Sequence, residues 1–126
     1  MEATQEQMLL MLELILPKEI LQHFAVTNLE VLPKEVHLYL DELNEVPEEY
    51  KSEKLSSKGF HPEAVIQDFP IRNKALYLHV RRRKWEVESS GKVVSKTWNL
   101  MADGTRYSKE FAAFLKGLLG YLPDKF

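Results

Sequence analysis

One segment constrains the fold of this chain more than any other, the alternating run from Leu76 to Trp85 that reads LYLHVRRRKW. Successive side chains of a β-strand point to opposite faces. Leu76, Leu78 and Val80 therefore share one face. The other face carries Tyr77, His79, Arg81, Arg83 and Trp85. This pattern predicts a half-buried strand from Ala75 to about Val87, in a sheet with one apolar face.

The strand ends in four consecutive cations, Arg81 to Lys84. Arg82 and Lys84 continue the apolar row, and a core does not absorb two cations cheaply. We therefore expect the strand to leave the core near Val80 and to project its end into solvent. Arginine donates paired hydrogen bonds to phosphate, and rings pack against sugars or bases, so the outer face suits nucleic acid. The alternative is an edge strand that is charged only to prevent aggregation.

The other segments follow from local signals in a chain of 126 residues, which is long enough for one globular domain over residues 1–126. Thr4 and Gln7 have the spacing of a capping box ahead of a helix that ends near Leu16, and a second helical turn follows Pro17. The predicted fold class is α+β, with antiparallel hairpins between an N-terminal and a C-terminal helix. The predicted segments are a helical N-terminal part (1–23), a β-hairpin (24–43), a loop (44–62), a basic β-hairpin region (63–100) and a C-terminal helix (108–119).

The hairpins and the last helix have specific signatures. The strand over residues 35–43 alternates between inward apolar and outward polar side chains, and the turn over residues 89–92 precedes a returning strand over residues 93–100. Ser108 is a good N-cap for the last helix. This helix places apolar side chains on one face, namely Phe111, Phe114, Leu115 and Leu118.

The charge is distributed unevenly along the chain. Residues 1–50 hold eleven acidic residues and two lysines, a net charge of −9, whereas residues 51–126 hold fifteen cations and eight acidic residues, a net charge of +7. Such asymmetry indicates a polyanionic partner for the basic half, and mutual neutralisation of the halves in the fold is the equal alternative.

Composition and spacing argue against catalysis. The sequence has no cysteine, and His23, His37, His61 and His79 have no metal-ligand spacing. We find no nucleophile-elbow, P-loop or dinucleotide-binding motif, so we expect no enzyme, no metal and no cofactor. The absence of cysteine fits a cytoplasmic location.

The apolar stretch from Met8 to Leu16 is too short to span a bilayer, so we expect no membrane association. A helix here is apolar around most of its circumference. It therefore either packs within the domain or docks on another chain, and the second case leaves open a homo-oligomer or a partner protein.

Several short motifs in one order resemble a known family. The segments over residues 16–24, 57–85, 91–100 and 104–115 resemble the N-terminal region of bacterial insertion-sequence transposases of the Aon type, within the ISL-three group. The similarity covers most of the chain, from Leu16 to Leu115. In the wider group an Asp-hydrophobic-Pro motif precedes a strand that ends in an aromatic residue after two arginines. The positions similar to these motifs are Asp68, Phe69, Pro70, Arg82, Arg83 and Trp85.

The resemblance implies a non-catalytic module that binds the DNA ends of an insertion element. The alternative is an accessory subunit that docks the catalytic transposase chain through its N-terminal helix or acidic half. The candidate DNA-binding residues are Arg72, Lys74, Tyr77, His79, Arg81, Arg82, Arg83, Lys84, Lys92, Lys96, Arg106 and Lys109.

The chain departs from the wider group at the zinc site, because it lacks the cysteines of the zinc knuckles. We therefore expect a zinc-ribbon-like hairpin without zinc. Our hypothesis is that apolar contacts hold this hairpin where related proteins use the metal. The residues proposed for these contacts are Trp85, Val87, Val94 and Trp98, and the two tryptophans could meet across the hairpin.

Overall fold

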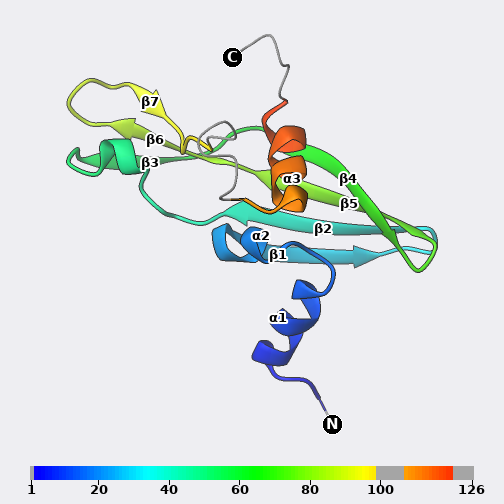
Figure 1. Ribbon diagram of the computed structural model, residues 1–126. Helices are drawn as coiled ribbons and strands as arrows, with labels where there is room; N and C mark the ends of the chain where they lie inside the picture. Colours follow the sequence, from blue (N-terminus) through cyan, green and yellow to red (C-terminus); the bar gives the residue numbers. More distant parts are fainter. Residues whose placement is uncertain (1, 99–106, 121–126) are drawn as a thin grey trace.

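The large sheet of this protein has four strands and carries its helices on one face. In the computed structural model, which describes residues 2–98 and 107–120, the strand order is β1-β2-β5-β4. The strands are β1 (Phe24–Val31), β2 (Glu35–Glu42), β4 (Ala64–Ile71) and β5 (Lys74–Arg81). The β1–β2 and β4–β5 pairs are antiparallel hairpins, whereas the central β2–β5 pair is parallel (Figure 1). The predicted α+β class is confirmed.

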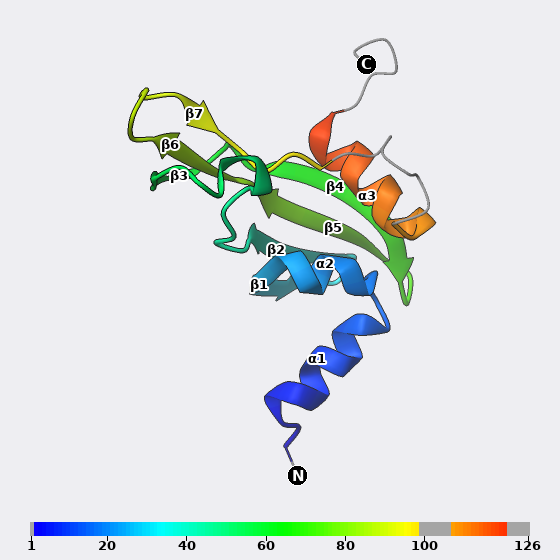
Figure 2. The same cartoon turned by 60° about the vertical axis from the view of Figure 1, so that its left-hand side comes forward.

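Two helices cover the apolar face of this sheet. They are α2 (Lys18–His23) and α3 (Lys109–Leu119), and they lie on the same side of the strands (Figure 2). Their buried residues share one core with alternate residues of β2 and β5. The core members from these elements are Ile20, Val36, Leu38, Leu40, Leu76, Leu78, Val80, Phe111, Phe114, Leu115 and Leu118. The alternation predicted for both strands is confirmed as far as Val80.

The first helix, α1 (Gln5–Glu13), begins as predicted and ends earlier. The Thr4 hydroxyl accepts the Gln7 N–H, and the Gln7 side chain accepts the Thr4 N–H, which completes the predicted capping box. The helix stops at Glu13, and Leu16 reaches the core from the following turn. None of the α1 residues is buried, and the helix extends away from the sheet (Figure 1).

A second, small sheet lies at one end of the large one. It contains β3 (Leu55–Phe60), β6 (Arg83–Val87) and β7 (Val93–Val94), in the order β3-β6-β7. The sequence predicts only a loop over residues 44–62, but this segment also contains the 3-10 helix η1 (Glu48–Tyr50) and β3. The β3 sequence LSSKGF is too polar to signal a strand, so the strand depends on its partner β6.

The apolar contacts of the small sheet correct part of the hairpin hypothesis. Trp85, Val87 and Val94 form a separate buried cluster with Tyr50 and Leu55 beside it, as apolar support of the hairpin requires. Trp98 does not belong to it, because its ring lies in the main core beside Phe24 and Phe111. The returning strand is also shorter than the predicted span of residues 93–100, of which 99 and 100 lie outside the described residues.

Candidate nucleic-acid interface

The four cations from Arg81 to Lys84 lie where the chain passes from one sheet into the other. β5 ends at Arg81, β6 begins at Arg83, and Arg82 belongs to neither strand. The buried positions are even-numbered up to Val80 and odd-numbered from Trp85 onward. The prediction that the strand end projects into solvent is therefore wrong, and Trp85 is buried rather than part of an outer binding face. The reason is that the small sheet supplies a second core.

Arg81 is neutralised by a carboxylate of the large sheet. Its Nε and Nη2 donate to the two carboxylate oxygens of Asp41 at 2.8 and 2.7 Å, and these hydrogen bonds raise the pKa of Arg81. The guanidinium also lies over the Phe60 ring, 4.1 Å from its centroid. Paired hydrogen bonds fix this group in one orientation. Arg81 is thus the least available cation of the four.

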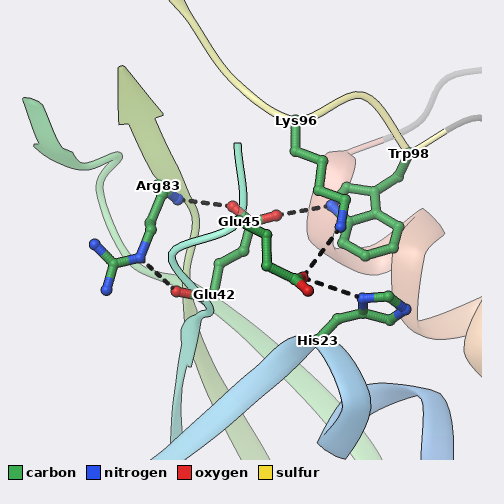
Figure 3. A network of polar contacts seen from close by, with 6 residues as sticks. All are labelled: His23, Glu42, Glu45, Arg83, Lys96 and Trp98. Atoms are coloured by element: carbon green, nitrogen blue, oxygen red, sulfur yellow. Dashed lines mark hydrogen bonds and ion pairs between the residues drawn. The ribbon is translucent and has the colours of Figure 1, made fainter. Parts of the chain in front are cut away.

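Arg83 shares the face of Arg81 but has no carboxylate on its side chain. Its guanidinium lies 4.8 Å from the Phe60 centroid, and its Nε donates to the carbonyl oxygen of Glu42 at 2.7 Å. Its two terminal nitrogens point away from Glu42 in Figure 3. In the described part of the chain these nitrogens have no ion-pair partner, so they remain able to bind an anion.

The charges of the other two cations, Arg82 and Lys84, act on His61. The backbone N–H of His61 donates to the Arg82 carbonyl at 2.8 Å, and the His61 ring Nε2 contacts the hydroxyl of Ser95. Arg82 Nη2 donates to the Lys96 carbonyl at 2.9 Å. Burial lowers the pKa of His61, and the charges of Arg82 and Lys84 lower it further.

Glu42 anchors the point where the chain passes from β5 to β6, and this role was not predicted from the sequence. Its side chain is only 2% exposed, and its carboxylate accepts the Arg83 N–H at 2.8 Å and the Trp98 Nε1–H at 2.9 Å (Figure 3). The signal was present, because Glu42 continues the inward row of Val36, Leu38 and Leu40 on β2. A charged residue at the end of a buried row indicates such an anchor.

Tyr77 and His79 lie on the face of the large sheet opposite the helices, in a row of polar contacts. His37 Nδ1 lies 2.7 Å from His79 Nε2, and Glu35 and Glu63 contact the outer nitrogens of these two rings at 2.8 and 2.7 Å. Tyr77 stacks on His37, and Tyr39 stacks on His79. The ring faces are thus turned toward one another, which leaves little free ring surface for stacked bases.

Of the other predicted cations that the structure describes, Lys74 and Lys96 have contacts of their own, and the Lys96 carbonyl adjoins Arg82. Arg72 and Lys74 lie at the opposite end of β5, about 23 Å away at roughly 3.3 Å per residue, and Lys74 Nζ donates to the Leu32 carbonyl at 2.7 Å. Lys96 pairs with Glu45 at 3.4 Å and lies over the Trp98 ring. The remaining three are Lys92 in the β6–β7 turn, Lys109 at the start of α3, and Arg106, which lies outside the described residues.

The charged halves of the chain neutralise each other only in part. The Asp41–Arg81 and Glu45–Lys96 pairs join the acidic half to the basic half. Arg82, Arg83 and Lys84, which we call the basic junction, have no carboxylate within ion-pair distance among residues 2–98 and 107–120. All three side chains are partly buried, and the contacts described above restrict the positions of Arg82 and Arg83.

Comparison with known proteins adds no family assignment. No protein-family model, no curated protein and no solved structure matches this chain. Residues 2–98 and 107–120 contain no group of three or more His, Asp or Glu side chains placed to hold a metal ion, and no helix with the length and apolar character of a membrane span.

Proposed function

We propose that this chain is a non-catalytic DNA-binding module and that the basic junction of Arg82, Arg83 and Lys84 contacts the DNA backbone. The uncompensated charge of these three consecutive, partly buried cations carries the proposal. Elsewhere in the described chain, several lysines are already paired with acidic residues, among them Lys51, Lys54 and Lys58.

The chemistry of the junction suits phosphodiesters. Phosphate contacts need donors held in place and charge that is not already neutralised. Arg83 is held at Nε and over the Phe60 ring, with its terminal nitrogens still available. The resemblance to insertion-sequence transposases suggests the ends of an insertion element as the DNA, in the cytoplasm. Catalysis then belongs to a separate chain or domain.

A salt series of DNA binding tests this proposal. We would measure the fluorescence anisotropy of a labelled duplex from an element end, and of a random duplex, between 50 and 200 mM salt. The double variant Arg83→Ala/Lys84→Ala should bind about tenfold more weakly or worse. Its slope of log affinity against log salt should be about 2 units shallower, because two phosphate contacts are lost.

The matched control is Lys51→Ala/Lys54→Ala, which removes the same charge from two exposed, ion-paired lysines. If both double variants lose affinity equally, binding reflects net charge and the junction is not the site. If the wild type shows no salt-dependent binding to either duplex, DNA binding itself is excluded.

A second candidate function is docking of the catalytic transposase chain through α1. The observation that favours it is the exposure of this helix: Met8, Leu9, Leu10 and Met11 are each more than half exposed, and Leu14 after the helix is 87% exposed. Copurification of the catalytic chain with the wild type, and its loss with Leu10→Glu/Leu14→Glu, would support this candidate. Copurification that is unchanged by the double variant would exclude α1 as the docking element.

A further inference from the structure

His61 lies at the basic junction, although its side chain is not one of the predicted DNA ligands. It follows β3, and its backbone N–H is tied to Arg82. Ser95, which follows β7, contacts its Nε2. Three chain segments thus meet at His61, and the charges of Arg82 and Lys84 both act on its ring.

The acidic side chains around this ring already have other partners. Glu63, two residues beyond His61, contacts His79 at 2.7 Å, and Glu86 of β6 pairs with Lys58 at 3.0 Å. Near Ser95, Glu45 pairs with Lys96, and Glu49 accepts the Thr97 hydroxyl. Among the described residues, the Arg82 side chain donates one hydrogen bond, from Nη2 to the Lys96 carbonyl, and its buried Nε has no partner. Among the described residues, no carboxylate lies within ion-pair distance of His61, Arg82 or Lys84.

We infer that His61, Arg82 and Lys84 form a seat for one backbone phosphate and that DNA binding there is coupled to proton uptake by His61. This inference rests on the proposed function. A neutral imidazole has one N–H donor, whereas an imidazolium has two. Protonated His61 can donate from Nε2 to Ser95 and still offer Nδ1–H to a phosphate oxygen.

The direction of the coupling follows from the charges. In the free protein, burial and the two neighbouring cations hold the pKa of His61 below its usual value. A bound phosphate supplies negative charge and raises that pKa again, so the bound state holds more protons between the two values. Affinity therefore rises as the pH falls through this interval. A single site limits the effect to about tenfold per pH unit.

The experiment compares DNA affinity at pH 7.5 and pH 6.0 at constant ionic strength, with the same labelled duplex. We expect the wild type to bind about threefold to tenfold more tightly at pH 6.0. His61→Gln keeps a polar group beside Ser95 but takes up no proton, so its affinity should be nearly the same at both values. His37→Gln, on the opposite side of the large sheet from the helices, is the matched control and should keep the wild-type gain.

The outcomes separate the two proposals. No DNA binding by the wild type at either pH overturns the proposed function. Salt-dependent binding with no gain at pH 6.0, or with an equal gain in His61→Gln, overturns only the phosphate seat. If His61→Gln does not fold, the His61 ring protons can be followed by NMR in the wild type. Their titration midpoint should move to higher pH when the duplex is added, and an unmoved midpoint contradicts the inference.

Discussion

Glu42 holds Arg83 twice, since its carboxylate accepts the Arg83 backbone N–H at 2.8 Å and its carbonyl oxygen accepts the Arg83 Nε at 2.7 Å. The same carboxylate also accepts the indole N–H of Trp98. The buried Glu42 side chain thus connects the end of β2 with the start of β6 and with Trp98, whose ring lies in the main core. The position of the basic junction depends on this contact.

Removal of the Glu42 carboxylate should destabilise the whole domain. Glu42→Ala leaves the Arg83 N–H and the Trp98 N–H without acceptors, which we expect to lower the free energy of unfolding by about 2–4 kcal/mol. Urea denaturation followed by tryptophan fluorescence measures this loss. Glu30→Ala, at an exposed position of β1, should change stability by less than about 0.5 kcal/mol and serves as the control. Equal losses in the two variants would show that Glu42 is not an anchor.

Truncation of Trp85 should affect the small sheet selectively. Trp85→Ala removes the largest side chain of the cluster of Trp85, Val87 and Val94. We expect this to lower the free energy of unfolding of the small sheet by about 3–5 kcal/mol. Hydrogen exchange should show lost protection of the amides in β3 and β6, while amides in β2 and β5 keep theirs. Uniform loss of protection in all four strands would mean that the two sheets unfold together.

The pKa of His61 predicts how stability changes with pH in the absence of DNA. Burial, with Arg82 and Lys84, holds this pKa below 6.5 in the folded state, so the unfolded chain binds more protons as the pH falls. The contribution of His61 is therefore constant above about pH 7. It becomes unfavourable as the pH falls through 6.5 toward the lower folded value. Urea midpoints at pH 7.5 and 5.5 should drop less in His61→Gln than in the wild type. An identical drop would contradict this assignment.

The start of α3 depends on Ser108. Its hydroxyl accepts the Phe111 N–H at 3.1 Å and also donates to Glu19 at 3.1 Å. Ser108→Ala should lower stability by about 1 kcal/mol, measured by thermal unfolding. Ser89→Ala in the exposed β6–β7 turn is the control and should change the midpoint little. If the unfolding midpoint of Ser108→Ala equals that of the wild type, the cap contributes nothing to stability.

The contribution of Glu19, which accepts hydrogen bonds from Ser108, to stability should depend on pH. Burial alone would raise the pKa of Glu19, but hydrogen bonds from Ser108 and the charge of Lys18 bring it below its ordinary value. Its stabilising contribution is therefore present above about pH 4.5 and is lost as the pH falls below that. Glu19→Gln should reduce stability at pH 7 and make little difference at pH 3. A loss of the same size at both values would exclude an ionic contribution.

Local signals in the sequence predicted the parts of the fold that depend on neighbouring residues. The capping box of Thr4 and Gln7, the hairpin turns and the N-cap of Ser108 each involve residues close together in the chain. Periodicity also identified the buried row of β5 as far as Val80. These features need no knowledge of distant partners.

The features that were missed depend on distant partners. The buried row changes from even-numbered to odd-numbered positions between Val80 and Trp85, but the four cations between them do not show that the chain enters a second sheet there. β3 is polar and exists because β6 pairs with it. The candidate site changed for the same reason: Asp41, 40 residues before Arg81, neutralises one of the two arginines that the sequence placed on the outer face. The sequence identified the run of four cations but could not show that Arg81 forms an ion pair with Asp41.

The central parallel pair of β2 and β5 has a consequence for how the protein folds. Residues 43–73 must be arranged before Leu38 can meet Leu78, so the middle of the large sheet closes only through contacts of high sequence separation. Such a topology slows folding, because a long loop loses entropy before its contacts form. A ribosome-bound chain that has emerged only as far as β4 would hold an isolated β1–β2 hairpin, which is marginal in water. During synthesis, one edge of β2 therefore stays unpaired until β5 has left the exit tunnel.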